Sequence, residues 1–143
     1  MQGKLAWFTG LSGSGKTTIA LRASEILKDA SKTVLILDGD IIRSQMHKHL
    51  GFSPEDIREN NRLIIGLGKE AMTNHEFVLV PIISPFLDSR DAARHVFGKT
   101  FVEVYIHATL SEVMSRDPKG LYREALKTGR TNIIGLSEEL PYQ

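Results

Sequence analysis

A glycine-rich segment near the amino terminus carries the residue types that bind phosphate groups. It reads Gly10-Leu11-Ser12-Gly13-Ser14-Gly15-Lys16-Thr17 and matches the pattern G-x-x-x-x-G-K-[ST]. Glycines allow successive backbone N–H groups to point at phosphate oxygens, at the positive end of the helix that follows. Lys16 would supply a positive charge to the β- and γ-phosphates, and the Thr17 hydroxyl would ligate Mg²⁺. The segment therefore predicts a binding site for a nucleoside triphosphate.

Two aspartates separated by one glycine form a second candidate site. Asp38 and Asp40 follow an apolar segment, and Arg43 comes three residues later. In phosphoryl transfer to a hydroxyl, one carboxylate can accept or orient the hydroxyl proton while the other holds metal-bound water. We take Asp40 as the candidate base and Asp38 as its partner, and the reverse order stays open. A simple Asp-Gly turn between a strand and a helix is the alternative.

Polar residues farther along the chain offer groups that bind phosphate or sulfate. They lie on two expected helices: Arg43, Arg58, Asn60, Asn61 and Arg62. Arginine forks match phosphate and sulfate oxygens, although a solvated helix face with Glu–Arg pairs explains any single member as well. Ser84 ends an apolar run and could contact the acceptor or only terminate a strand. His47 and His49 are expected to be exposed to solvent rather than to bind a metal.

Four apolar segments must position these residues, and they are typical of strands buried on both faces. Rich in Val, Ile and Phe, they cover residues 4–9, 33–38, 76–83 and 100–106. The first leads directly into the glycine-rich segment, and a helical pattern over residues 17–28 follows it, which is the context of a phosphate-binding loop. Ser53 and Pro54 mark the start of a helix that could run to about residue 75. The alternation predicts an α/β fold in which helices cover both faces of a parallel sheet, a three-layer sandwich.

Length and composition exclude several classes of protein. The chain has 143 residues, of which 41% are hydrophobic and 24% charged, with a formal net charge of +1. These values fit a single domain, residues 1–143, and argue against disorder, a nucleic-acid partner or a membrane surface. The sequence contains no cysteine, which excludes disulfides and thiolate chemistry. The longest apolar run, residues 77–83, is too short to span a bilayer, and we expect a cytoplasmic protein.

Motifs of other nucleotide-binding proteins are missing or misplaced in this sequence. The tetrad [NT]-K-x-D, which specifies guanine in GTPases, does not occur. Residues 117–120 fit the D-x-x-G pattern of a switch segment, but they follow a helical pattern rather than a strand. Together with residues 128–132 they are expected to be mobile segments outside the core. A small kinase is the better interpretation.

Six separated segments carry more specific motifs. They are residues 10–18 (GLSGSGKTT), 37–40 (LDGD, followed by Arg43), 50–62 (LGFSPEDIRENNR), 83–86 (ISPF), 101–105 (FVEVY) and 116–122 (RDPKGLY). Together they resemble the adenylylsulfate (APS) kinase family over essentially the whole chain. Members of that family are P-loop kinases that phosphorylate the 3′-hydroxyl of adenosine 5′-phosphosulfate with MgATP.

The resemblance implies a nucleotide-kinase-like fold, a homodimer, and a lid over about residues 116–135. It implies these catalytic residues: Asp40, Asp38, Lys16 and Ser84. ATP would be bound by residues 10–18 and Arg116, and Mg²⁺ would enter with ATP and contact Thr17. The acceptor nucleotide would be bound by Asp38, Arg43, Phe52, Arg58, Asn60, Ser84, Lys119 and Ile133. Family chains continue beyond the segment that matches residues 141–143, so the C-terminal end of the fold is expected to be missing here.

Four positions differ from the family's pattern, and all fall on the expected acceptor side. Ile57 stands where the family has an acceptor-binding arginine, and Leu87 and Thr131 replace an arginine and a lysine. Ile133 replaces a phenylalanine that stacks on the acceptor base. Two kinase activities therefore stay open, one on APS that yields PAPS for sulfate activation, and one on a different nucleotide such as a cytidine diphosphoramidate. A nucleotide-binding module without acceptor chemistry is disfavoured by the acidic pair beside an intact phosphate-binding loop.

Overall fold

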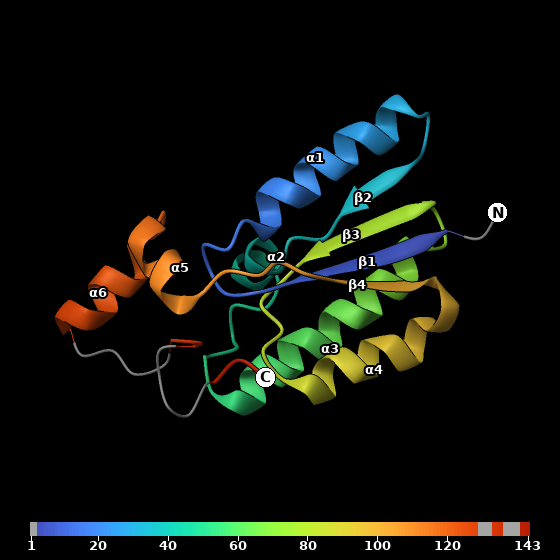
Figure 1. The fold of residues 1–143 in the computed structure, drawn as a ribbon. Helices are drawn as coiled ribbons and strands as arrows, with labels where there is room; N and C mark the ends of the chain where they lie inside the picture. Colours follow the sequence, from blue (N-terminus) through green and yellow to red (C-terminus); the bar gives the residue numbers. More distant parts are fainter. Residues whose placement is uncertain (1–2, 129–132, 136–140) are drawn as a thin grey trace.

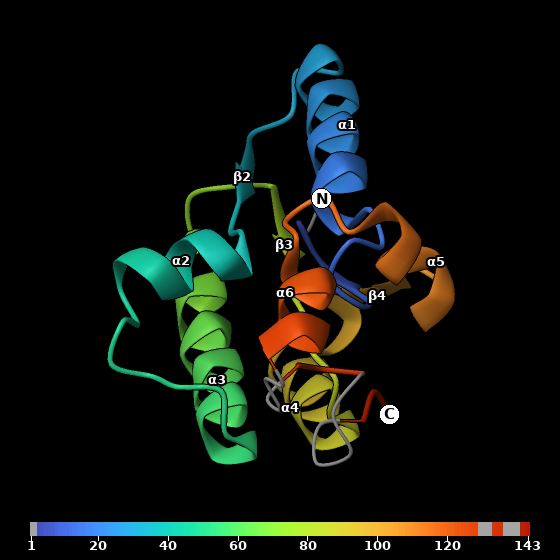
Figure 2. The ribbon, with the colours of Figure 1, turned by 90° about the vertical axis from the view of Figure 1, so that its left-hand side faces the viewer.

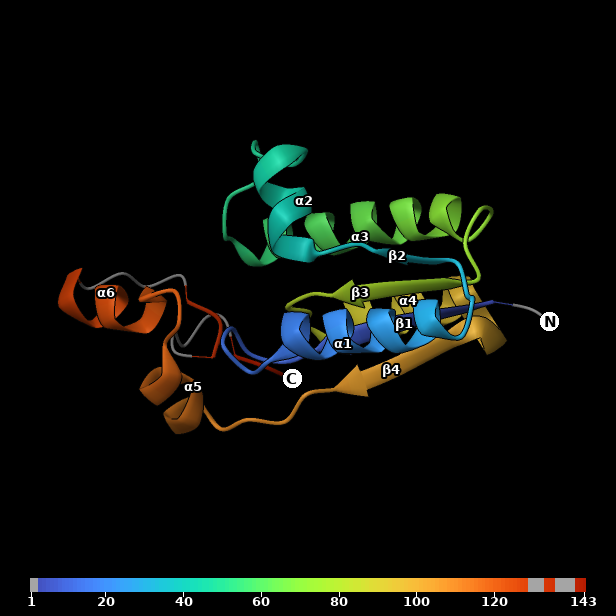
Figure 3. The same ribbon diagram turned by 90° about the horizontal axis from the view of Figure 1, so that it is seen from above.

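Four parallel strands form the centre of the computed structural model, which describes residues 3–128, 133–135 and 141–143. The strands are β1 (Lys4–Thr9), β2 (Val34–Ile36), β3 (Phe77–Pro81) and β4 (Phe101–Tyr105), in the order β2-β3-β1-β4. All three pairings are parallel, so the carboxyl ends of the strands lie at one edge of the sheet. Figures 1 and 3 show α2, α5 and α6 gathered beyond that edge. This is the edge at which open α/β sheets bind ligands.

Helices cover both faces of the sheet. The helices are α1 (Lys16–Asp29), α2 (Gly39–Gln45), α3 (Pro54–Ala71), α4 (Leu87–Phe97), α5 (Leu110–Arg116) and α6 (Leu121–Thr128), with a short 3₁₀ turn at Gly98–Thr100. Leu5 and Trp7 of β1 pack into the core beneath α3 and α4, whereas Phe8 packs with Ala20 of α1 on the other face. Figures 2 and 3 show α1 on one side of the strands and α3 and α4 on the other. The predicted three-layer architecture is confirmed. None of the helices within the described residues is long and apolar enough to cross a membrane.

Local capping signals decide where two of these elements begin and end. The strand expected over residues 33–38 is shorter, because Asp38 caps α2 instead and accepts hydrogen bonds from the backbone N–H groups of Asp40 and Ile41. Helix α3 begins as expected, with the Ser53 hydroxyl accepting from the backbone N–H of Asp56. It ends at residue 71, earlier than the expected residue 75.

The expectation that residues 117–120 lie outside the core is wrong for Asp117, whereas Pro118 and Lys119 are exposed as expected. Asp117 is buried and ends α5 in a left-handed backbone conformation, with φ of 30°. Its carboxylate accepts hydrogen bonds from the backbone N–H groups of Tyr122 and Arg123 in the first turn of α6. One capped turn therefore joins the two helices, and no long loop is needed. Residue 128 ends α6, and residues 129–132 lie outside the described part of the chain.

Two glycines of α3 provide a matched test of how closely this helix packs on the sheet. A Cβ atom at Gly66 would meet no heavy atom within 4 Å, whereas one at Gly68 would lie 2.8 Å from Leu5 Cδ1 and 3.1 Å from Phe97 Cζ. We expect Gly66→Ala to raise the free energy of unfolding by about 0.5–1 kcal/mol, because alanine favours a helix. Gly68→Ala gains the same helix preference but crowds the core, and we expect it to lower the free energy of unfolding by about 1 kcal/mol or more. Urea denaturation measures both values, and equal shifts would contradict this packing.

Candidate active site

The phosphate-binding loop joins the end of β1 to the start of α1. Gly13 and Gly15 have φ values of 83° and 105°, a region that glycine adopts without strain, and Gly15 is the N-cap residue of α1. Lys16 is the first residue of the helix and is buried. Its ammonium donates a hydrogen bond of 2.8 Å to the backbone carbonyl of Leu11. The loop backbone therefore positions its own lysine next to the positive end of α1.

A cleft of about 350 Å³ opens beside this loop. Many of the residues singled out from the sequence line it: Ser12, Gly13, Gly15, Lys16, Thr17, Thr18, Asp38, Asp40, Arg116 and Lys119. The remaining walls come from residues 81–83, at the end of β3 and just after it, and from Pro118. Elsewhere in the loop, Gly10 lies against the backbone of Ile106, and Ser14 is buried. The cleft thus joins the first candidate site, the second candidate site and part of the expected lid.

Carboxylates and ammonium groups face one another around the cleft. One oxygen of Asp38 accepts a hydrogen bond of 3.1 Å from the Thr17 hydroxyl, while the other caps α2. Asp40 forms an ion pair with Lys119. Burial lowers the pKa of Lys16 to about 8, a shift that Asp40 opposes and Lys119 increases. Beside the phosphate-binding loop there are thus hydroxyl and carboxylate oxygens and one buried ammonium, that of Lys16. Together these groups suit phosphoryl transfer.

A second cleft, of about 460 Å³, adjoins the first and shares Asp40 with it. Arg43 and Phe52 line this second cleft, and the Arg43 guanidinium lies 3.9 Å from the centre of the Phe52 ring. Arg43 also donates a hydrogen bond to the backbone carbonyl of Gly51. Burial lowers the pKa of Arg43, and the nearby carboxylates of Asp40 and Asp56 oppose that shift. A cation and an aromatic ring therefore line the same cleft as Asp40, and these are groups that suit a nucleotide.

Asn60 lines neither cleft itself, but it forms a buried pair with His47, which lines the second cleft, and the sequence pattern did not indicate this pair. Its Oδ1 atom is 2.9 Å from Nδ1 of His47. The expected exposure of His47 is wrong, because its side chain is 7% exposed, whereas His49 is exposed as expected. His47 follows the end of α2, and its ring reaches α3 across the connection between the two helices. The described residues contain no group of three or more His, Asp or Glu side chains that could hold a metal ion.

Arg58 and Ser84 also do not line either cleft. Arg58 lies over the ring of Phe86 at 4.0 Å and pairs with Asp88 of α4 at 2.9 Å. Ser84 is fully buried, and its hydroxyl is hydrogen-bonded to Oδ1 of Asn61 at 2.6 Å. Asn61 was included in the polar cluster for its type alone, and no sequence signal marked it as the partner of Ser84.

The comparison with known families rests on nearly the whole chain. The family model described as adenylylsulphate kinase matches residues 2–143. This chain belongs to the adenylylsulphate kinase family. A probable adenylyl-sulfate kinase of Pyrococcus abyssi is 41% identical over 142 residues, which cover 97% of this chain and 81% of that relative. An adenylyl-sulfate kinase of Clostridium kluyveri is 44% identical over 141 residues, which cover 99% of this chain and 70% of that relative.

A solved structure supports the same assignment. The APS kinase of Mycobacterium tuberculosis in complex with AMPPNP and APS matches with a TM-score of 0.92 and 38% sequence identity. The match covers 99% of this chain and 83% of that one. The resemblance inferred from the sequence motifs is therefore confirmed, and so is the P-loop kinase fold.

Positions that differ from the family's pattern are packed in different ways. Ile57 is buried in an apolar cluster with Phe86. Ile133 is also buried, in the small core between α5 and α6. Leu87 is exposed at the start of α4, and Thr131 lies outside the described residues. The two isoleucines therefore contribute packing contacts at these positions.

The lowered pKa of Lys16 makes nucleotide affinity depend on pH. Below pH 8 the ammonium is charged and attracts phosphate oxygens, and above that pH the free enzyme loses this charge. We expect the affinity for ATP to fall as the pH rises from about 7 to about 9.5, approaching tenfold per pH unit well above the pKa. Calorimetric titration at constant free Mg²⁺ measures the affinity. Lys16→Met has no titrating group and is expected to bind weakly at every pH, and a flat profile in the unsubstituted protein would contradict the argument.

Proposed function

We propose that this protein is an ATP-dependent adenylyl-sulfate kinase. It would transfer the γ-phosphoryl group of ATP to the 3′-hydroxyl of adenosine 5′-phosphosulfate and release ADP and 3′-phosphoadenosine 5′-phosphosulfate. The observation that carries the proposal is the single cleft lined by both the phosphate-binding loop and the Asp38/Asp40 pair. Family membership supports the acceptor, since a solved relative was obtained in complex with AMPPNP and APS.

On the ATP side, the loop backbone and Lys16 would hold the phosphates, and Arg116 would approach from the lid. The Thr17 hydroxyl and the Asp38 carboxylate are oxygen ligands 3.1 Å apart, a donor set that fits Mg²⁺ carried in with the nucleotide. Bound Mg²⁺ would neutralise negative charge on the phosphates. Lys16 would exchange its hydrogen bond with the Leu11 carbonyl for phosphate oxygens, and the burial of this ammonium would strengthen that attraction.

On the acceptor side, Asp40 would orient the 3′-hydroxyl and accept its proton. As that hydroxyl oxygen bonds to the γ-phosphorus, the bond from phosphorus to the β,γ-bridging oxygen breaks, and ADP leaves. Lys119, which pairs with Asp40 in this structure, would move to the transferred group when the acceptor takes its place. Arg43 and Phe52 in the adjoining cleft would bind the remainder of the acceptor.

The resemblance also supports proposals about assembly and setting. Residues 1–143 would act as one kinase domain on small-molecule nucleotides. The protein would work as a homodimer in the cytoplasm.

Measurement of ADP release with different acceptors tests the proposed function. With MgATP, we expect saturable turnover when APS is added and little turnover with ATP alone. Cytidine diphosphate derivatives serve as the matched acceptors, because they would suit a site in which Ile57 and Ile133 replace charged and aromatic groups. Turnover with those derivatives and silence with APS would replace the proposed acceptor, and ATP hydrolysis independent of any acceptor would reject the kinase activity itself.

Asparagine substitutions distinguish the roles of the two aspartates. We expect Asp40→Asn to lower kcat with APS by about 10²-fold or more with little change in the KM for ATP, because a general base is lost. Asp38→Asn retains a side chain that caps α2, so we expect folding to be preserved and the Mg²⁺ concentration needed for activity to rise. Initial rates over a Mg²⁺ series measure both effects. The opposite pattern would assign the base role to Asp38.

A further inference from the structure

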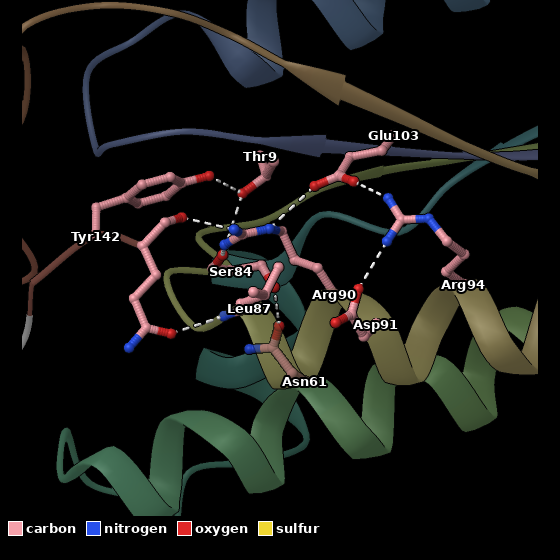
Figure 4. Close-up of polar contacts among 10 residues, drawn as sticks. Thr9, Asn61, Ser84, Leu87, Arg90, Asp91, Arg94, Glu103 and Tyr142 are labelled. Carbon is pink, nitrogen blue, oxygen red and sulfur yellow. Dashed lines mark hydrogen bonds and ion pairs between the residues drawn. The ribbon is translucent and has the colours of Figure 1, made fainter.

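A buried arginine supports the segment that follows β3, next to one wall of the first cleft. Arg90 lies in α4, is 7% exposed, and does not line either of the two clefts. Figure 4 shows that its guanidinium points toward the ends of β1 and β3. It donates hydrogen bonds of 2.6 Å to the backbone carbonyls of Ser84 and Gln143, and it pairs with Glu103 of β4 at 3.0 Å. One side chain thus joins the segment after β3, strand β4 and residue 143.

The carbonyl oxygen of Ser84 connects Arg90 with the strand that leads into the phosphate-binding loop. The same oxygen accepts a hydrogen bond of 3.4 Å from the hydroxyl of Thr9, the last residue of β1 before the loop. Residues 82 and 83, next to Ser84, line the central cleft. The position of the Ser84 carbonyl relative to Thr9 therefore sets the position of one cleft wall relative to the loop that would hold ATP.

Residues 142 and 143 complete this cluster. The Tyr142 hydroxyl is 2.5 Å from that of Thr9, and the Gln143 side chain accepts a hydrogen bond of 2.9 Å from the backbone N–H of Leu87. The backbone N–H of Gln143 donates to the carbonyl of Pro85 at 2.7 Å. Segment 84–87 is therefore held through its own backbone, and the charge of the arginine is balanced by a carboxylate.

We infer that Arg90 is a positioning residue for phosphoryl transfer. By holding the Ser84 carbonyl next to Thr9, it keeps segment 82–86, in which the family resemblance places the acceptor-binding residue Ser84, in register with the phosphate-binding loop. The inference rests on the proposed kinase function. Its geometric basis is the fork of the guanidinium, whose N–H groups serve two carbonyls and one carboxylate, a combination that a lysine ammonium cannot reproduce. Misplacement of reacting groups by about 1 Å can lower a rate by about 10²-fold.

Arg94 provides the matched control, because it shares one partner with Arg90 but lacks the others. It lies one turn later in α4 and pairs with Glu103 and with Asp91. Its side chain is 48% exposed. No contact of Arg94 with segment 84–87 or with residues 142 and 143 is found among the described residues.

Steady-state kinetics with MgATP and APS compare Arg90→Lys with Arg94→Lys. We expect Arg90→Lys to lower kcat/KM for the acceptor by about tenfold or more, while the KM for ATP stays within about twofold. Arg94→Lys is expected to leave both values within about twofold. Should Arg90→Lys fail to fold, Glu103→Gln removes the balancing charge but keeps an oxygen for the guanidinium, and it must show the same selective loss for the acceptor. Equal losses for both substrates, or equal behaviour of the two lysine variants, would overturn the inference.

Hydrogen exchange of the nucleotide-free protein separates this inference from the proposed function. We expect the backbone N–H of Leu87, which is bonded to Gln143, to exchange about tenfold faster in Arg90→Lys than in Arg94→Lys. If the unsubstituted protein does not use APS, the proposed function fails and the exchange rates alone decide whether Arg90 holds this segment. Unchanged exchange in Arg90→Lys would overturn the inference whatever the acceptor.

Discussion

The arrangement of charged groups at the carboxyl edge of the sheet depends on one buried positive charge, the ammonium of Lys16. A buried charge needs hydrogen bonds and opposite charges, and here it has the Leu11 carbonyl and the nearby carboxylates of Asp40 and Asp38. Those carboxylates in turn have their own partners, the Thr17 hydroxyl for Asp38 and the Lys119 ammonium, in the turn after α5, for Asp40. The phosphate-binding loop, the start of α2 and the turn after α5 are therefore linked through one chain of charges.

Helices α5 and α6 are attached to the phosphate-binding loop by packing as well as by charge. Tyr122 of α6 is buried, and its hydroxyl donates a hydrogen bond of 2.9 Å to the backbone carbonyl of Ser12. Burial raises the pKa of Tyr122 to about 12, so this donor keeps its proton over the physiological range. Pro118 lies close to Gly13, and Leu11 packs against the small core of α5 and α6. A shift of the loop backbone would therefore also shift the segment that carries Lys119.

Behind the first cleft, segment 84–87 is organised by buried polar groups rather than by the apolar core. Ser84 contacts Thr9, Asn61 and Arg90, which come from three different elements. Such groups are costly to bury unless each finds a partner, so the cluster favours a single arrangement of β1, α3 and α4. The apolar layers above and below the sheet make the fold stable, whereas these directional contacts decide how its polar edge is arranged.

The sequence by itself determined the features whose signals are local. Apolar segments that alternate with helical patterns predicted the parallel three-layer fold. The spacing of residues 10–17 predicted the phosphate-binding loop. Ser53 predicted the start of the helix whose first turn it caps. Only the tertiary structure decided that His47 is buried against Asn60, or that Asp117 is a buried cap rather than part of a loose loop. These contacts depend on how helices rotate and cross on the sheet. A shift of one residue turns a helical side chain by about 100°, which residue types and spacing along a single chain do not specify.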